Sequence, residues 1–217
     1  MASQTDKSKK TTLFLLAALL VSVVVVAFVL YQAARRPAEA APEDTEYTGT
    51  VYDPPVELSV FTLPSSTGEP LSLSDLRGRW AVLFFGYTHC PDFCPLTLAE
   101  YKQVRRLLGD DADAVQIVFI SVDGVRDTPE ALAKYLALFD PTFIGLSGDD
   151  ETLARIGPEY SLFYERRTDT GSGADYLIDH TTRSYLVDPE GRLRVSFAFG
   201  TEPEIVAESI RRQIKAG

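Results

Sequence analysis

Cysteine and histidine are scarce in this chain of 217 residues, which contains two of each. The two cysteines, Cys90 and Cys94, lie four positions apart. Two cysteines at one locus cannot link distant parts of a fold, so a stabilising disulfide framework is excluded. The role of the pair must therefore be local.

Basic residues are also in the minority. The formal net charge is −10, with 21 Lys and Arg against 31 Asp and Glu. Five of the basic residues flank the first apolar segment, so the remainder of the chain is more acidic still. Phosphate binding needs clustered Lys and Arg, and we therefore expect no nucleic acid partner.

A long uncharged segment lies near the N-terminus. No charged residue occurs from Thr11 to Ala34, and about 20 apolar residues at ~1.5 Å each match a ~30 Å hydrocarbon core. A cleaved signal peptide is the alternative, because residues 38–40 resemble a cleavage site, although its apolar region would normally be ~7–15 residues long. Both alternatives export the rest of the chain. We predict a single-pass inner-membrane protein whose soluble domain lies in the periplasm or an equivalent extracytoplasmic space. The expected parts are a cytoplasmic tail and transmembrane anchor over 1–36, a flexible linker over 37–55 and one domain over 56–217.

Within that domain, apolar runs alternate with amphipathic segments. Runs without polar alternation suit central strands buried on both faces. We expect strands over 57–62, 80–87, 114–122, 143–146, 183–187 and 193–199, and helices over 95–108, 129–139, 149–157 and 202–214. This order predicts an α/β, thioredoxin-like sandwich behind the N-terminal transmembrane helix. The cysteines would follow the first central strand, at the sheet edge where α/β proteins place their chemistry.

The cysteine loop has features that favour reactive thiols. It precedes a predicted helix, whose positive end favours thiolate, the form that attacks disulfides and binds metals. Pro91 and Pro95 each bias the preceding cysteine away from helical geometry, so neither cysteine need lie inside the helix. Two thiolates that converge on one point suit Cu(I). The alternative is an inert disulfide or simple burial of the two side chains.

Three blocks of sequence carry a family resemblance. The first is GYTHCPDFCP at 86–95, the second is SVD at 121–123 with RDTP at 126–129, and the third is DH at 179–180 with YLVDPEG at 185–191. Together they resemble the Sco/SenC family of copper chaperones and keep the family's order across nearly the whole domain. Gly124 and Val125 stand where the family more often has Pro and Glu, a difference confined to a turn.

The resemblance implies a function and a set of ligands. Cys90, Cys94 and His180 would bind one copper ion per chain, as Cu(I) or Cu(II), and the domain would help to assemble the copper-A site of cytochrome c oxidase. The implied partners are the copper-A subunit of the oxidase and a second periplasmic protein that donates copper. His89 is the alternative histidine ligand, but adjacent residues rarely both face one ion in a tight loop.

Two other functions use the same thiols. A thiol-disulfide oxidoreductase could keep the oxidase cysteines reduced, although residues 181–183 lack the proline that such enzymes of this fold normally have before the corresponding strand. A redox or copper sensor would require a regulatory partner. Oxidation of the thiols would release copper, so binding and thiol exchange can belong to one cycle. Asp123 and Asp127 either form hydrogen bonds near the site or, for Asp127, cap the helix at Pro129.

Overall fold

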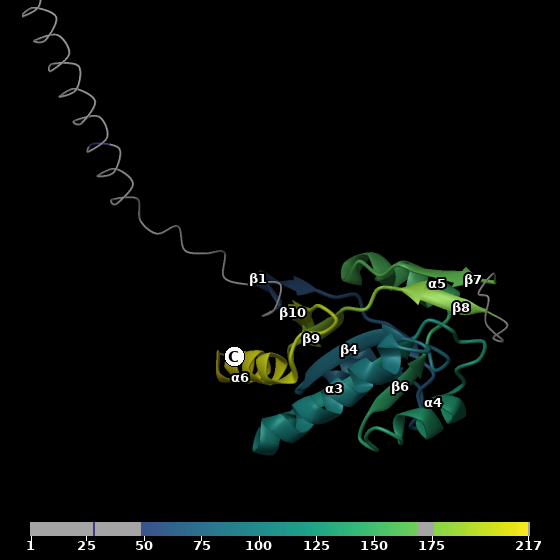
Figure 1. Cartoon of the computed structure of the whole chain (residues 1–217), viewed down its shortest axis with the longest axis horizontal. Helices are drawn as coiled ribbons and strands as arrows, with labels where there is room; N and C mark the ends of the chain where they lie inside the picture. Colours follow the sequence, from purple (N-terminus) through teal and green to yellow (C-terminus); the bar gives the residue numbers. More distant parts are fainter. Residues whose placement is uncertain (1–27, 29–48, 169–175, 217) are drawn as a thin grey trace, which may run out of the picture. The chain divides into compact units, whose positions relative to one another are not determined.

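The computed structural model describes residues 28, 49–168 and 176–216 (Figure 1). The chain divides into two compact units, Met1–Asp44 and Thr45–Gly217. The predicted anchor, apart from Phe28, and residues 37–48 of the predicted linker lie outside the described residues. Within the described part of the chain, no helix has the length and apolar character needed to cross a membrane.

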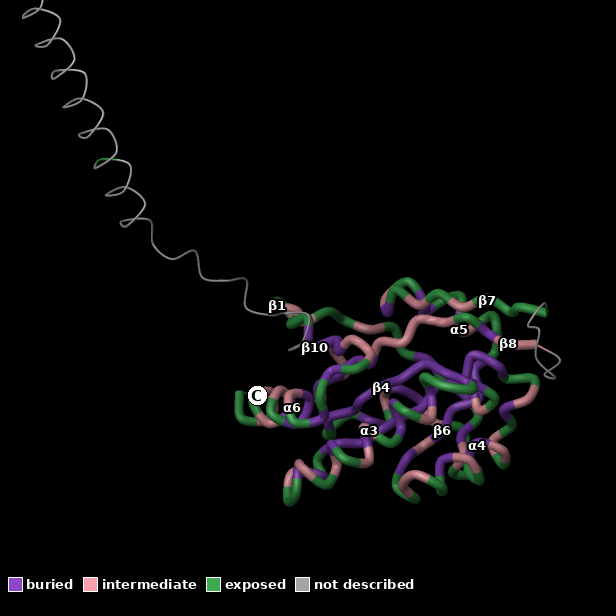
Figure 2. The backbone as a smooth tube through the Cα atoms, in the orientation of Figure 1, coloured by how far each residue is buried: buried purple, intermediate pink, exposed green. Residues whose placement is uncertain are grey.

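A six-stranded mixed sheet forms the centre of the second unit. In spatial order its strands are β1 (Thr50–Glu57), β10 (Arg192–Phe197), β9 (Ser184–Val187), β4 (Trp80–Gly86), β5 (Val115–Ser121) and β6 (Ile144–Ser147). β4, β5 and β6 run parallel, and the other neighbours pair antiparallel. Every residue of β4 and β5 is buried, as Figure 2 shows for the middle of the domain. Apolar runs of this kind are expected where both faces of a sheet are covered.

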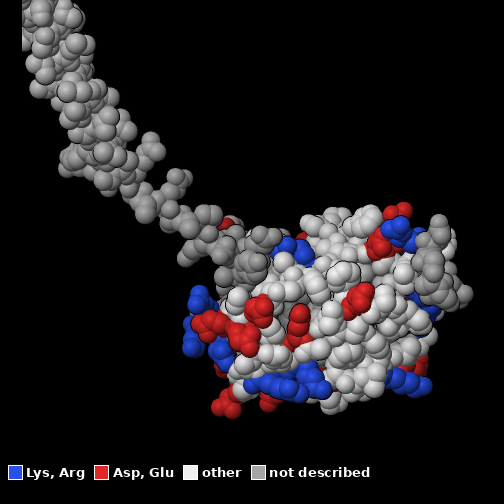
Figure 3. Space-filling model, viewed as in Figure 1, with Lys and Arg blue, Asp and Glu red and all other residues white. Residues whose placement is uncertain are grey.

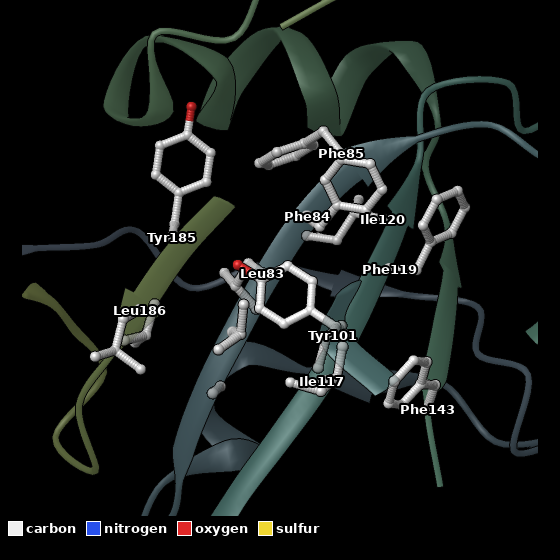
Figure 4. Packing of buried hydrophobic residues seen from close by; sticks show 14 of the residues in the cluster. Leu83, Phe84, Phe85, Tyr101, Ile117, Phe119, Ile120, Phe143, Tyr185 and Leu186 are labelled. Atoms are coloured by element: carbon white, nitrogen blue, oxygen red, sulfur yellow. The ribbon is translucent and has the colours of Figure 1, made fainter. Parts of the chain in front are cut away.

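Helices cover the two faces of this sheet. They are α3 (Phe93–Leu108), α4 (Pro129–Leu136), α5 (Asp150–Ile156) and α6 (Pro203–Ala216), with short 3-10 turns η1 (Leu73–Leu76), η2 (Gly109–Ala114) and η3 (Gly157–Tyr160). On one face, the ring of Phe84 lies 5.6 Å from that of Phe119. On the other face, Phe85 lies beside Tyr185 (Figure 4) and 5.1 Å from Tyr160 of η3. The predicted α/β, thioredoxin-like sandwich is confirmed.

Two small hairpins lie outside the main sheet. One joins β2 (Thr62–Leu63) to β3 (Leu71–Ser72), and the other joins β7 (Tyr164–Arg167) to β8 (Leu177–His180). Among the described residues, β7 and β8 pair only with each other. Figure 1 shows this second hairpin apart from the central strands. The position of the β7–β8 hairpin therefore depends on side-chain contacts and on individual hydrogen bonds to its backbone.

Most predicted elements are present, and side chains cap the first turns of two helices. Thr128 Oγ1 accepts from the Ala131 amide at 3.3 Å at the start of α4. Asp149 Oδ1 accepts from the Thr152 amide at 2.8 Å at the start of α5. These contacts satisfy amides that a helix leaves free in its first turn.

The first strand is displaced from its prediction. The strand expected over 57–62 is wrong, because β1 ends at Glu57 and β2 begins at Thr62. Residues 50–55, which their composition placed in the linker, belong to β1, and the first two of them pair with β10. Pro54 and Pro55 fit an edge strand, where an amide is not needed on the outer side. The register shifts between Val51 and Val56, around the two prolines.

Charged side chains on the domain surface lie near partners of opposite sign. On the face shown in Figure 3, small acidic and basic groups surround a broad uncharged area. On α6, Arg212 Nε lies 3.0 Å from Glu208 Oε1. Exposed pairs of this kind contribute little to stability, typically about 0.2–1 kcal/mol each.

Candidate metal centre

The two cysteines lie at the junction of β4 and α3. Cys90 is in the connecting loop, whereas Cys94 is the second residue of α3. The bias of Pro95 against helical geometry at the preceding residue thus does not keep Cys94 out of the helix. Pro95 is compatible with this position, since proline is tolerated in the first helical turn, where amides have no partner within the helix.

Gly86 provides the space that the Cys94 sulfur occupies. Cys94 is fully buried, and a Cβ atom at Gly86 would lie 2.7 Å from Cys94 Sγ and 2.7 Å from the Phe119 ring. Real Cβ atoms do not approach other atoms so closely. The last residue of β4 must therefore lack a side chain for the sulfur to reach its observed depth.

His180 lies beside the buried sulfur. Its Nε2 atom is 3.5 Å from Cys94 Sγ, and its Nδ1 atom is 2.9 Å from the carbonyl oxygen of Thr181. A carbonyl only accepts, so Nδ1 carries a proton and donates it to Thr181, which turns the Nε2 edge of the ring toward the sulfur. His180 is the last residue of β8 and pairs with Tyr164 of β7.

These three side chains form a potential metal site. The ligand atoms of Cys90, Cys94 and His180 all lie within 4.8 Å of one another. Two thiolates and an imidazole suit copper, because soft sulfur ligands select Cu(I) and imidazole also binds Cu(II). Cys90 and His180 line an open groove of about 310 Å³, whose wall also includes Pro91, Asp92, Phe93 and Leu177. An ion at the site would be reached from this groove.

The two thiols differ in their electrostatics. Hydrogen bonding from the Cys94 thiol, with a smaller contribution from His180, lowers the pKa of Cys90 to about 4 despite some desolvation. Burial raises the pKa of Cys94. Cys90 is therefore the thiolate of the pair, and Cys94 holds the proton between them in the metal-free, reduced protein.

Alkylation of the reduced, metal-free protein should reveal this difference. We expect iodoacetamide to modify Cys90 first, with a rate that changes less than about twofold between pH 6 and pH 8, because its thiol is already ionised. An ordinary thiol of pKa ~8.5 would react roughly 70-fold faster at the higher pH. Peptide mass spectrometry measures both rates, and Cys90→Ser should leave only slow modification of Cys94. A steep pH dependence at Cys90 would contradict the assignment.

A buried carboxylate holds the cysteine loop in place. Asp127 is fully buried and accepts from the Thr88 amide at 2.9 Å, from the Thr88 hydroxyl at 2.5 Å and from the Ser121 hydroxyl at 2.6 Å. Thr128, and not Asp127, caps α4. Of the two expectations for Asp127, the structure thus supports a role near the site, where it joins the ends of β4 and β5.

His89 is not part of the three-ligand cluster. Its side chain is 54% exposed, and its Nδ1 atom lies 3.0 Å from the Thr88 hydroxyl. Tyr87, by contrast, is buried below His180, with the two ring centroids 5.7 Å apart at an angle of 85°. The Tyr87 hydroxyl accepts from the amide of Ile178 on β8 at 3.2 Å. Tyr87 therefore supports the histidine and its strand.

Sequence reasoning missed part of the surroundings of the site. Asp123, which it did consider, is fully buried and pairs with Arg126 and Tyr176. Arg126 belongs to a block that carried the resemblance, but nothing in the sequence linked it to Tyr176, fifty positions away. That contact depends on how the β7–β8 hairpin folds back.

The fold and the cluster together define a class. This is a thioredoxin-like domain with two cysteines at the end of its first central strand and a histidine brought beside them. The family model described as SCO1/SenC matches residues 52–215. The chain belongs to the SCO1/SenC family.

Individual relatives agree with this assignment. The mouse protein named "SCO2 homolog, mitochondrial" is 38% identical over 158 residues, which are 72% of this chain and 62% of that protein. The chain thus spans about three fifths of the length of this relative. The Bradyrhizobium japonicum ScoI structure with copper bound has 39% identity and a TM-score of 0.65, over 72% of this chain and 99% of that one.

A more distant structure shows the same fold. BsSco, described as a member of the Sco family of cytochrome c oxidase assembly proteins, is 21% identical with a TM-score of 0.60, over 75% of this chain and 93% of that one. At this identity the likeness concerns the fold alone.

Proposed function

We propose that this protein is a copper metallochaperone that binds one copper ion through Cys90, Cys94 and His180. The observation that carries the proposal is the convergence of these three ligand atoms within 4.8 Å of one another beside an open groove. A three-coordinate ion leaves a side open to an incoming ligand. Cargo that must be handed on needs such access, whereas a storage site would enclose the ion.

The acceptor we propose is the copper-A site of cytochrome c oxidase. Membership of the SCO1/SenC family supports this destination, because the resemblance of the cysteine and histidine blocks to that family implies a role in assembling this site. We further propose that residues 1–36 anchor the protein in the inner membrane with the domain on the extracytoplasmic side. Their long uncharged run supports the anchor.

Thiol-disulfide exchange is the second candidate function. It is favoured by the asymmetry of the pair, in which Cys90 has a lowered pKa and Cys94 is fully buried. In such a reaction the Cys90 thiolate attacks a substrate disulfide and releases one substrate thiolate. Cys94 then gives up its proton and attacks Cys90, so that the second substrate sulfur leaves and the protein holds the disulfide. In the structure both cysteines are free thiols.

The variant His180→Ala separates the two functions. We expect it to weaken Cu(II) binding by more than the roughly 10–100-fold that loss of an outer-shell partner costs, since a ligand itself is removed. Calorimetric titration gives the affinity, and electron paramagnetic resonance reports the loss of a nitrogen ligand.

His89→Ala is the matched control, because it removes the other histidine of the chain. It should bind copper as the unmodified protein does. If His180→Ala keeps the original Cu(II) spectrum and affinity, His180 is not a ligand. If the unmodified protein takes up no copper after anaerobic reconstitution but reduces disulfides, the oxidoreductase function replaces the chaperone function.

A further inference from the structure

One of the three proposed ligands lies on a hairpin that is not part of the main sheet. Cys90 and Cys94 are fixed by β4 and α3, whereas His180 ends β8, whose only strand partner in the described part of the chain is β7. The ladder of the main sheet includes Ser184, opposite Phe84 of β4, but not His180 four residues earlier. Contacts outside this ladder therefore help to hold the hairpin.

Tyr176, directly before β8, makes the first of these contacts. Its hydroxyl donates to Asp123 Oδ1 at 2.7 Å, and its carbonyl oxygen accepts from Arg126 Nη1 at 3.2 Å. The Arg126 guanidinium also lies over the Tyr176 ring, 3.6 Å from the centroid. Asp123 and Arg126 come after β5, the strand beside β4, so these contacts tie the hairpin to the sheet edge that carries the cysteines.

Arg126 is the centre of this cluster. Its Nε atom pairs with the fully buried Asp123, and its guanidinium lies 5.8 Å from the centroid of Tyr87, the ring that supports His180. Its Nη2 atom is buried and has no hydrogen-bond partner among the described residues. Arg166 of β7 also lies near the Tyr176 ring, 4.6 Å from its centroid. The tyrosine thus contacts two guanidinium groups, one from the sheet edge and one from the hairpin itself.

We propose that Arg126 is a positioning residue, which through Tyr176 and Asp123 holds the β7–β8 hairpin so that His180 faces Cys94. A planar guanidinium is needed for this role, because it must stack on a ring and donate to a carbonyl at the same time. Lysine at this position would keep the charge beside Asp123 but lose the stacking and the fixed direction of the second donor. The metal-binding consequence of this inference rests on the proposed function, whereas the position of His180 does not.

The test uses Arg126→Lys, with Arg192→Lys as its matched control. Arg192 also pairs through Nε with a buried aspartate, Asp188, at 2.8 Å. Asp188 directly follows Val187 of β9, and Val187 pairs with Ala81 near the start of β4. The cysteines follow the other end of β4, so the Arg192–Asp188 pair lies away from the site. Both variants therefore disturb an arginine–aspartate pair, but only one lies at the site.

The first readout is nuclear magnetic resonance of the reduced, metal-free protein. With two histidines in the chain, the ring signals of His180 are assigned by their loss in His180→Ala. We expect Arg126→Lys to remove the cross-peak between the His180 and Tyr87 rings, and Arg192→Lys to retain it. The second readout is Cu(II) affinity, which should fall roughly tenfold in Arg126→Lys and stay unchanged in Arg192→Lys.

The outcomes separate this inference from the proposed function. A retained His180–Tyr87 cross-peak in folded Arg126→Lys overturns the positioning role. Loss of the cross-peak with unchanged copper affinity supports the positioning role and instead removes His180 from the proposed ligands. If Arg126→Lys does not fold, Tyr176→Phe replaces it in the same measurement, because this variant keeps the ring but loses the hydrogen bond to Asp123. A His180–Tyr87 cross-peak of undiminished strength in Tyr176→Phe overturns the proposal.

Discussion

Replacement of Cys94 by serine should reduce the copper content of the reconstituted protein from about one ion per chain to nearly none, because Cu(I) binds thiolates far more strongly than hydroxyls. Cys94 is the buried ligand of the proposed site, beneath Gly86 and next to Phe119. No other cysteine exists to replace it, since Cys90 is the remaining one. Metal analysis after anaerobic reconstitution, with gel filtration to remove loose copper, measures the change.

Two further variants show whether this loss concerns the ligand or the packing of α3. Cys94→Ala keeps the buried position small and apolar, and should lose copper to the same extent. Thr97→Val alters the next buried position of the same helix, where the Thr97 hydroxyl has no hydrogen-bond partner in the described part of the chain, and should retain copper. Full copper retention in both Cys94 variants would exclude this sulfur as a ligand and with it the proposed site.

Asp127→Asn should have the largest effect on stability among the changes near the site. Three donors point at this one buried carboxylate, from Thr88 and Ser121. An amide carries no charge and has one acceptor oxygen, so three charge-assisted hydrogen bonds are lost or weakened and the Thr88 hydroxyl must accept from the amide nitrogen instead of donating. We expect the free energy of unfolding to fall by about 2–4 kcal/mol, with weaker copper binding because the loop before Cys90 loses its anchor.

Asp188→Asn provides the comparison for this variant. Asp188 is also buried and accepts from the amides of Glu190 and Arg192, in the turn between β9 and β10. Urea unfolding should show a similar loss of stability in both variants, while copper titration should show weaker binding in Asp127→Asn alone. Equal copper affinities in the two would mean that Asp127 acts on the fold only.

Much of the fold was predictable because its strongest signals are local. The fully apolar runs of β4 and β5 and the caps at Thr128 and Asp149 each depend on a few neighbouring residues. β1 was not predictable in the same way. Its residues are mostly exposed and include two prolines, so its strand conformation depends on β10, which lies about 140 positions later in the chain.

The site, like the fold, has parts that local sequence predicts and parts that depend on distant residues. The chemistry of Cys90 and Cys94 could be inferred from their spacing and place after a central strand, whereas His180 came from the family resemblance. The depth of Cys94 could not be predicted, because it depends on the space left by Gly86 and on the tolerance of Pro95 in the first turn of α3. The contact between Arg126 and Tyr176 could not be predicted either, because it joins the segment after β5 to a hairpin outside the main sheet.

The separation of the ligands along the chain has a consequence for biosynthesis. His180 lies 86 positions after Cys94, so a chain growing from its N-terminus presents both thiols before the imidazole has been made. β9, which pairs with β4 in the middle of the sheet, is made later still. A half-made or truncated chain can hold copper through two sulfurs only. Complete three-ligand coordination would therefore mark a domain whose translation has passed His180 and whose hairpin has docked.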